Sequence, residues 1–373
     1  MHKKRKIQTI FPFIFLAIIG YVTWDGFRLL SNHPLFQTIY VTLNILFFLF
    51  FMLALFVGHH LPIRLASLIA FVGNTYLIAA LYLFLLFLLT DVVLLLNSLI
   101  HFIPGYVLGY HFDWIIIDFV LIAMVLLIGN YRFNHPKTVI LNLESNKPKQ
   151  QKTLKIVAVS DIHLGFSIKK EKLQRYVAMI NQTKPDLILM IGDVSDRSMQ
   201  PIIEQNMVEE LSQLKATFGV YAINGNHEHY AETPEATSTY LKTAGIHVLI
   251  DETACIDQSF YLIGRDDKSN IKRQPLASLV KGLDPTLPKI LLDHQPYQLQ
   301  EAQHNDIDLQ LSGHTHEGQF FPGNLFVKKI FEIQYGYRKI GNTHYYVSSG
   351  LGIWGPQYRI GTQSEMVVIH FNY

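Results

Sequence analysis

The sequence of 373 residues is poor in charge and almost without cysteine. Charged residues make up 16% of it, against about 25% in an average soluble protein. The single cysteine, Cys255, excludes a disulfide within one chain, and we expect it to be a small buried hydrophobic residue beside Ile256. The net charge of +2 gives no support for a nucleic-acid partner, which usually leaves a strongly basic surface.

The shortage of charge is concentrated in the first third of the chain. Residues 7–131 contain six charged side chains, namely Asp25, Arg28, Arg64, Asp91, Asp113 and Asp118. A membrane-spanning helix needs about 20 mostly apolar residues. Four such spans are predicted, at about 7–30, 35–57, 65–89 and 114–130. The stretch 91–102 is too short to span alone, and we interpret it as an extension of the third helix or as an interfacial segment.

The first predicted span follows the basic residues 2–6 and could be a signal peptide, but no small-residue cleavage site follows it, so we expect an anchor. Lys and Arg are frequent before the first span and after the last, Arg64 lies in the second connection, and the other two connections have almost none. By the positive-inside rule this bias predicts an integral protein of a bacterial-type inner membrane with its large domain in the cytoplasm. A fifth span at 91–102 would reverse the orientation.

From residue 132 onward the charge density is that of a soluble enzyme. We predict a helical transmembrane domain at 1–135, a polar linker or first edge strand at 136–152, and a catalytic domain at 153–373. Within the last, buried-strand patterns each end at a polar motif: LKIVAVS before Asp161, DLILMIG before Asp193, GVYAIN before Asn226, KILLD before His294 and IDLQLSG before His314. Strands that alternate with helices predict α/β layering, in which ligands gather beyond the carboxyl ends of the strands.

These motifs contain side chains that bind divalent cations through oxygen or nitrogen. They are Asp161, His163, Asp193, Asn226, His227, His294, His314 and His316. None is a thiolate, which suits manganese, iron or zinc. Two divalent ions about 3.5–4 Å apart can hold both the attacking and the departing oxygen of a phosphoryl transfer. Two cations at that distance need a shared anionic ligand, and Asp193 is the best candidate; Gly192 before it lets the turn approach the site closely.

The ordered motifs D-x-H, G-D-x-x-D, G-N-H-E, a lone His and G-H-T-H resemble those of the calcineurin-like metallophosphoesterases. Within them the chain is most similar to the membrane-associated branch that contains the YkuE-type phosphoesterases and the UDP-2,3-diacylglucosamine pyrophosphatases. The resemblance covers about residues 152–373. It implies a four-layer αββα sandwich, here preceded by an all-α transmembrane bundle of about four helices.

The resemblance also implies a role for each residue. One metal ion would be bound by Asp161, His163 and His316, the other by Asn226, His294 and His314, and Asp193 would bridge them. A metal-bridging hydroxide would attack phosphorus, and the catalytic His227 would lie near the leaving group as an acid or a phosphate donor. Asp196 and Glu228 would support these residues without binding metal. Glu317 and Asp293 depart from the family pattern, but neither removes a ligand.

Two further features concern the substrate. Residues 320–339 mix large apolar residues with Lys and Arg, which predicts contact with an anionic membrane or an acyl chain, the alternative being an ordinary hairpin. Arg359 lies in a tail that resembles the closing glycine-rich loop of the family, and we predict that it binds a substrate phosphate, because guanidinium suits phosphate geometry.

We therefore predict a membrane-anchored phosphoesterase that uses two divalent ions, with manganese favoured and iron or zinc as alternatives. Its substrate would be a phosphorylated or nucleotide-activated lipid, and we infer no nucleic acid and no protein partner. One alternative is a phosphodiesterase for soluble nucleotides. Another is a membrane sensor or transporter with a regulatory phosphoesterase domain, which predicts paired polar residues inside the spans; we see essentially one, Asp118, and favour an interfacial position for it.

Overall fold

The computed structural model describes residues 2–56, 61–108, 111–147, 152–230 and 234–373, without the side chains of residues 2–13, 106, 111 and 112. The chain divides into two compact units. The first comprises residues 1–128 and 355–357, and the second comprises residues 129–354 and 358–373. The domain boundaries expected from the sequence stay a prediction, and residues 148–151 of the expected linker lie outside the described residues.

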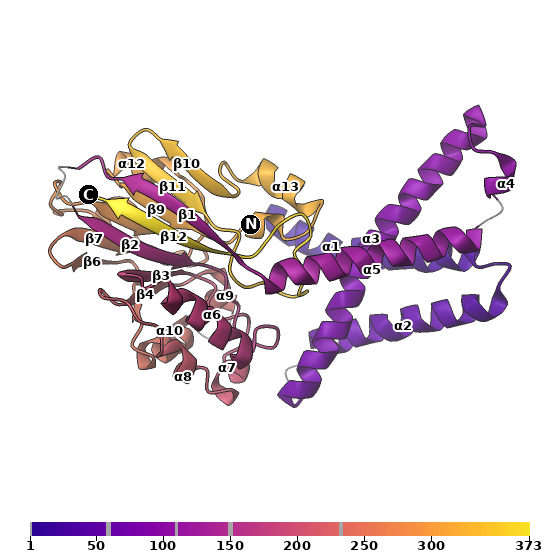
Figure 1. The fold of residues 1–373 in the computed structure, drawn as a ribbon, viewed down its shortest axis with the longest axis horizontal. Coiled ribbons are helices and arrows are strands. Elements are labelled where there is room, and N and C mark those ends of the chain that lie inside the picture. The colour runs from indigo at the N-terminus through magenta and orange to yellow at the C-terminus, as the bar shows by residue number, and fades with distance from the viewer. Residues whose placement is uncertain (1, 57–60, 109–110, 148–151, 231–233) are drawn as a thin grey trace. The chain divides into compact units, whose positions relative to one another are not determined.

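The helices of the first unit are apolar, and all but the short α4 are long. They are α1 (His2–Leu29), α2 (Pro34–Phe56), α3 (Ile63–Ile100), α4 (Gly105–Leu108) and α5 (His111–Asn134), whose last residues belong to the second unit (Figure 1). Among the described residues, α2, α3 and the segment Asp113–Asn134 of α5 are long and apolar enough to cross a membrane. Because α3 continues to Ile100, most of the stretch 91–102 extends the third helix, which was one of the two interpretations of this stretch. The span at 7–30 falls in α1 and stays a prediction.

Charged side chains connect two of these helices. Arg28 Nη2 of α1 lies 2.5 Å from Asp25 Oδ1 and 2.5 Å from Asp91 Oδ1 of α3. Tyr21 donates a hydrogen bond of 2.7 Å to Asp91. The expectation of a single unpaired acid in this region was therefore too simple. Arg28 and Asp91 are 63 positions apart, and only the packing of α1 on α3 brings them together.

In the part of the second unit that the structure describes, the strands form two six-stranded sheets. The first sheet contains, in spatial order, β1 (Lys137–Glu144), β12 (Glu365–Asn372), β2 (Thr153–Val159), β3 (Leu187–Ile191), β4 (Val220–Ile223) and β5 (His247–Val248). The second contains β10 (Gly336–Ile340), β11 (Thr343–Val347), β9 (Leu309–Ser312), β8 (Lys289–Leu292), β7 (Phe260–Gly264) and β6 (Glu252–Ile256). β1 lies within the expected linker and forms the edge of the first sheet, parallel to β12.

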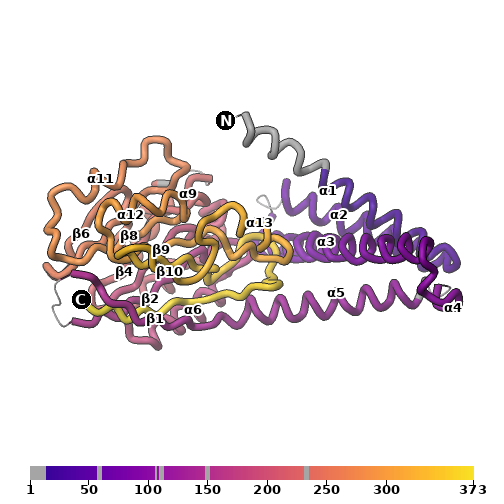
Figure 2. The backbone as a smooth tube through the Cα atoms, turned by 90° about the horizontal axis from the view of Figure 1, so that it is seen from above, coloured from indigo at the N-terminus to yellow at the C-terminus, as the bar shows by residue number. Residues whose placement is uncertain are grey.

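The sheets pack face to face between two layers of helices. In β2, Ile156 and Ala158 lie in the core between the sheets, whereas Val157 and Val159 pack under helices, as the period of two requires. The helices over the first sheet are α6 (Lys170–Gln182), α7 (Gln200–Glu204), α8 (Val208–Leu211) and α10 (Pro234–Thr243); those over the second are α11 (Leu276–Leu279) and α12 (Gln300–His304). Figure 2 shows α6 and α12 on opposite sides of the sheets. The predicted αββα sandwich is confirmed.

Cys255 is exposed, contrary to the expectation of a buried residue. β6 is an edge strand, and the alternation of its side chains turns Ile256 inward and Cys255 outward. The hydrophobicity of the residues next to Cys255 does not determine which face of the strand its side chain lies on.

Candidate metal centre

The predicted ligands follow the carboxyl ends of five strands. Asp161 and His163 follow β2, Asp193 follows β3, Asn226 and His227 begin α9 (Asn226–Tyr230) after β4, His294 follows β8, and His314 and His316 follow β9, the latter in the short 3-10 helix η2 (His316–Gly318). β2, β3 and β4 are parallel neighbours in one sheet, and β8 and β9 are parallel neighbours in the other. The strand ends thus bring together residues far apart in the sequence.

Asp161, His163 and His316 form one group of three, each offering a ligand atom within 4.8 Å of the others. His316 Nε2 lies 3.1 Å from His163 Nε2 and 3.4 Å from Asp161 Oδ1. Burial lowers the pKa of His163 to about 3 and the pKa of His316 well below its usual value, so both imidazoles are neutral at pH 7. Neutral nitrogens this close suit joint binding of one divalent ion, for which metal–nitrogen distances are about 2.0–2.1 Å.

Asp193, His294 and His314 form a second group. His294 Nδ1 lies 2.8 Å from the carbonyl oxygen of Ile191, so Nδ1 carries a proton and Nε2 faces the group. His294 Nε2 is 3.2 Å from Asp193 Oδ2. Burial alone would lower the pKa of His294, but Asp193 and Asp161 outweigh it and raise the pKa well above its usual value. The carboxylates of Asp193 and Asp161 therefore favour a positive charge beside them, at His294.

Asp193 belongs to the second group and also approaches the first. Its Oδ2 is 3.2 Å from His294 Nε2 and 3.8 Å from His163 Nε2. Its Oδ1 accepts a hydrogen bond of 2.8 Å from the main-chain N–H of His227. Burial would raise the pKa of Asp193, but His294 holds it well below its usual range, so the carboxylate stays ionised. This is the position that a bridging carboxylate needs.

Several buried atoms of the cluster have no hydrogen-bond partner. Among the described residues, they include His163 Nδ1 and Asn226 Oδ1. Leaving a buried polar atom without a partner costs about 1–3 kcal/mol. Asn226 Oδ1 is a ligand atom of the kind that binds divalent cations, so the residues present fit a metal ion here.

The backbone of the cluster is strained. Asp161, His163, Asp193, His314 and His316 all have positive φ, between 48° and 68°. Such a conformation costs a non-glycine residue about 1–2 kcal/mol and persists where surrounding structure fixes it, often at functional sites. Hydrogen bonds between the turns do so here: Asp161 N–H donates to Gly192 and His163 N–H to Asp193. A Cβ on Gly192 would lie 2.6 Å from His294 Nδ1, so glycine is required, as predicted.

Two acids hold the residues around the ligands. His227 Nδ1 lies 3.0 Å from the carbonyl oxygen and 3.1 Å from Oδ1 of Asp196. Burial would lower the pKa of His227, but Asp196 outweighs it and raises the pKa to about 9. Glu228 accepts hydrogen bonds from the N–H groups of Asp193 (3.0 Å) and Gly225 (2.7 Å), which ties the turn after β3 to the turn after β4. Asp196 and Glu228 thus hold in place the residues around the ligands.

Arg359 lies beside His316 and is 0% exposed. Its Nη1 donates to the carbonyl of His316 at 3.0 Å and its Nη2 to the carbonyl of Gly352 at 2.8 Å. Binding of a substrate phosphate by Arg359 stays a prediction, and the guanidinium contacts described are internal. Glu317 has a φ of 54°, the conformation that a glycine at this place would adopt without strain.

Two buried acids beside the cluster were not predicted from the sequence. Asp266 and Asp267 follow β7 and are 2% and 0% exposed. His229 Nε2 lies 3.0 Å from Asp266 Oδ1, so His229 belongs to the same network. Gln295, next to His294, donates to both carboxylate oxygens of Asp267 at 2.9 Å. The signal was present, since FYLIGRDD repeats the pattern of a buried strand that ends at acids.

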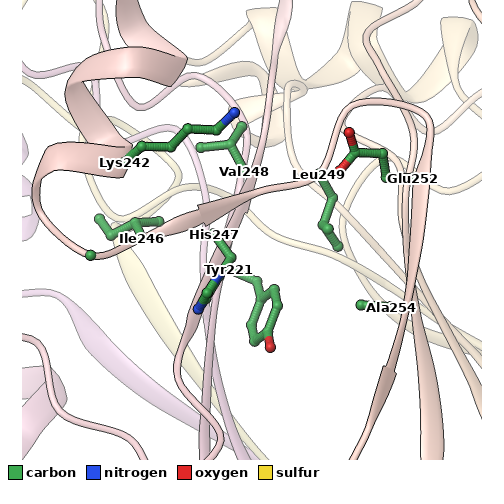
Figure 3. Close-up of a pocket in the computed structure, with 9 residues that line it drawn as sticks. Tyr221, Lys242, Ile246, His247, Val248, Leu249, Glu252 and Ala254 are labelled. Atoms are coloured by element: carbon green, nitrogen blue, oxygen red, sulfur yellow. The ribbon is translucent and has the colours of Figure 1, made fainter.

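A surface pocket of about 480 Å³ lies apart from these ligands, none of which lines it. Its lining includes Lys242, Glu252 and two residues whose rings stack, Tyr221 and His247, with centroids 5.0 Å apart (Figure 3). The pocket lies at the β5 edge of the first sheet and has none of the ligand groups described above.

Comparison with known proteins extends these observations. The family model described as calcineurin-like phosphoesterase matches residues 154–318. A metallophosphoesterase of Campylobacter jejuni is 33% identical over 229 residues, 60% of each chain. A transmembrane protein with metallophosphoesterase domain of Danio rerio is 34% identical, over 63% of this chain and 57% of that protein. A metallophosphoesterase of Aquifex aeolicus is 30% identical, over 66% of this chain and 97% of its own.

The chain thus spans about 60% of the length of the first two of these relatives. Among solved structures, a 5'-nucleotidase precursor from Thermus thermophilus matches with a TM-score of 0.35 and 14% identity, over 59% of this chain and 55% of that one. A dimetal phosphatase from Danio rerio matches with a TM-score of 0.33 and 11% identity, over 53% of this chain and 87% of that one. Likeness at this level carries no argument about activity.

Proposed function

Because the chain belongs to the calcineurin-like phosphoesterase family, we propose that it is a membrane-anchored, metal-dependent phosphoesterase that hydrolyses a phosphate ester or pyrophosphate bond. The family uses a dinuclear divalent metal site. The observation that carries the proposal is the meeting of two groups of ligands on either side of Asp193. The buried Asn226 Oδ1, which has no hydrogen-bond partner among the described residues, supports it.

In this proposal each residue keeps the role that the family resemblance implies. One ion would be held by Asp161, His163 and His316, the other by Asn226, His294 and His314, and Asp193 would serve both. Bound there, the two cations would lower the pKa of a water molecule and offset the charge of the phosphate. We favour manganese, with iron or zinc as alternatives, because all the ligand atoms are oxygen or nitrogen.

His227 would supply the proton that the leaving group needs. Asp196 engages Nδ1, so Nε2 is the nitrogen left for a substrate. The hydrogen bond of Nδ1 to Asp196 outweighs burial and raises the pKa of His227 above its usual value, which favours the protonated ring. A protonated imidazole can donate to a departing oxygen, which makes His227 the proposed general acid.

The substrate that we propose carries a lipid, and α13 (Gly323–Ile330) supports this. None of the residues of this helix is buried. Leu325, Phe326 and Ile330 are 51%, 64% and 62% exposed, and Lys328 and Lys329 lie in the last turn. Large exposed apolar side chains next to cations suit the interface of an anionic bilayer.

Both ends of α13 adjoin the candidate metal centre. The helix follows η2, which contains His316. Beyond its other end, the ring of Phe331 packs against His314, with centroids 5.9 Å apart, and against Tyr297, with centroids 4.9 Å apart. A lipid that contacts α13 would therefore lie near the ligands. We further propose a bacterial-type inner membrane, and from the Lys and Arg bias we expect the metal centre on its cytoplasmic side.

The ion pair of Arg28 with Asp91 favours a second candidate, a membrane sensor whose phosphoesterase activity is regulated. Charged residues inside membrane helices are costly and are often retained for function. In that case neutralising the pair with Asp91→Asn would change the response of turnover to a membrane signal. In the main proposal it would leave turnover of a soluble substrate unchanged.

A substrate assay tests the main proposal. Full-length protein in nanodiscs of anionic lipid is stripped with a chelator and then given Mn²⁺, Fe²⁺ or Zn²⁺. We expect hydrolysis of an aryl phosphodiester to return with metal. Phosphorylated or nucleotide-activated lipids in the same bilayer should also be cleaved, with products identified by mass spectrometry. Turnover that survives chelation would contradict the metal mechanism, and faster turnover of soluble nucleotides than of every lipid would contradict the lipid substrate.

A further inference from the structure

Arg359 is the largest fully buried side chain of the described residues. No carboxylate among those residues forms an ion pair with it, and its guanidinium donates to main-chain carbonyls. Asp161 and Glu365 offset part of its charge at longer range, but burial of the guanidinium still lowers the pKa of Arg359. A cation this deeply buried is costly, so we ask which segments its hydrogen bonds hold in place. The hydrogen bonds of its guanidinium and of its main chain indicate which segments Arg359 holds in place.

The guanidinium joins two segments that carry ligands of the first group. Nη1 donates to the carbonyl of His316 at 3.0 Å. Nη2 donates to the carbonyl of Gly352 at 2.8 Å, and the N–H of Gly352 in turn donates to the carbonyl of Asp161 at 3.0 Å. Arg359 thus links the main chain of His316 to that of Asp161. None of the hydrogen bonds described for the guanidinium reaches Asp193, His294 or His314.

His316 has reason to need this support. Its φ of 48° lies in the left-handed region, and Glu317 after it has a φ of 54°. Two consecutive non-glycine residues in that region cost about 1–2 kcal/mol each. The carbonyl of His316, held by Arg359 on one side and by the N–H of Gln319 at 2.9 Å on the other, fixes the peptide that orients the imidazole.

The main chain of Arg359 is held by the end of α5. Its N–H donates to the carbonyl of Gly129 at 2.9 Å. A Cβ on Gly129 would lie 2.8 Å from Ile360 Cγ1, so the approach of the helix depends on glycine. Beyond it, Phe133 is 1% exposed in the core under the first sheet, and Asn134 accepts a hydrogen bond of 2.7 Å from Lys172.

We propose that Arg359 is a positioning residue that sets His316 against Asp161, and that the end of α5 sets Arg359 in turn through Gly129. The inference rests on the proposed function, because it takes Asp161, His163 and His316 as the ligands of one ion. It assigns Arg359 to one metal position only. It also makes the last turns of α5 part of the scaffold of that position.

The test counts metal ions in full-length protein purified in detergent. Equilibrium dialysis against Mn²⁺ gives the number and affinity of the sites, and electron paramagnetic resonance reports the magnetic coupling of a close ion pair. In Arg359→Lys we expect one site to keep its affinity and the other to weaken at least about tenfold, the lower end of the effect of losing a partner of a metal ligand. The coupling should disappear at Mn²⁺ concentrations that still give it in the parent protein.

Gly129→Ala provides a second variant if Arg359→Lys does not fold. It should weaken the same single site, and Gly129→Ala with Ile360→Ala should restore it by removing the crowded atom. Gly20→Ala in α1 is the matched control, because a Cβ there meets nothing within 4 Å, and it should bind two ions like the parent.

The outcomes separate the two claims. Two ions bound with unchanged affinity in both Arg359→Lys and Gly129→Ala would overturn the positioning role and leave the proposed function standing. Equal weakening of both sites would overturn it as well, because it would indicate general destabilisation. A parent protein that binds fewer than two ions would overturn the proposed function itself, and this inference with it.

Discussion

The two units differ in where they expose large apolar side chains. In the first unit such side chains are exposed along α2, α3 and α5. In the second unit the largest group lies within residues 321–337 and consists of Phe321, Leu325, Phe326, Ile330 and Tyr337. Surfaces suited to lipid therefore occur in both units, whereas the buried carboxylates and imidazoles that could hold metal occur together in the second.

Replacing Asp193 would remove the chemistry from the second unit and leave both apolar surfaces intact. In Asp193→Asn we expect turnover of an aryl phosphodiester to fall more than about 100-fold, because the loss of mere partners of metal ligands already costs about 10–100-fold. Asp257→Asn is the matched control, since that side chain is 56% exposed and away from the cluster. Steady-state rates in Mn²⁺ measure both variants, and equal rates would break the assignment.

Proton donation by His227 can be tested with two substrates that differ in their leaving groups. In His227→Gln, cleavage of an alkyl ester should fall by roughly 10²–10⁴-fold, the usual contribution of a general acid. The kcat for a nitrophenyl ester should fall much less, because its leaving group departs without a proton. The measurement is kcat on the two esters, with His247→Gln as the control. An equal loss on both substrates would contradict proton donation by His227.

The apolar surface of α13 can be tested without touching a ligand. With Leu325→Glu and Phe326→Glu combined, turnover of a lipid phosphate in anionic vesicles should fall at least about tenfold. Burying a single Leu or Phe is worth about 1.5–3 kcal/mol, and tenfold corresponds to about 1.4 kcal/mol.

Turnover of a soluble aryl ester by that double variant should not change. Ile271→Glu is the control, because Ile271 is 97% exposed and lies outside the apolar group of residues 321–337. Equal losses on the lipid and the soluble substrate would show that α13 acts through the fold and not through lipid.

The smallest effect concerns backbone strain at Glu317. Glycine relieves a left-handed φ that costs about 1–2 kcal/mol, and it loses about 0.5–1 kcal/mol of that through its greater freedom in the unfolded chain. Glu317→Gly should therefore raise the midpoint of thermal unfolding by a few degrees at most, with metal binding intact. A lower midpoint would indicate that the carboxylate of Glu317 makes a contribution that outweighs the strain.

The sequence predicted the parts of the second unit that follow from strand patterns. Buried strands before Asp161, Asp193 and His294 appear where expected, because a short apolar run that ends at a polar motif has few other structural solutions. The convergence of the ligands followed from the same rule, since parallel strands bring their carboxyl ends to one edge.

The features that were not predicted from the sequence depend on packing between segments that are far apart in the chain. The pair of Arg28 and Asp91 forms only when α1 packs on α3. Burial of Arg359 requires the closing loop to turn inward beneath His316, and an arginine in a glycine-rich tail gives no sign of that. The side that Cys255 faces depends on the register of an edge strand.

Whether two cations share Asp193 can be determined by anomalous X-ray scattering from crystals of the manganese-loaded protein. We expect two manganese peaks, one among Asp161, His163 and His316 and the other among Asn226, His294 and His314, with the Asp193 carboxylate between them. Crystals grown with Mn²⁺ that show no peak at these side chains, or peaks only elsewhere on the molecule, would contradict it.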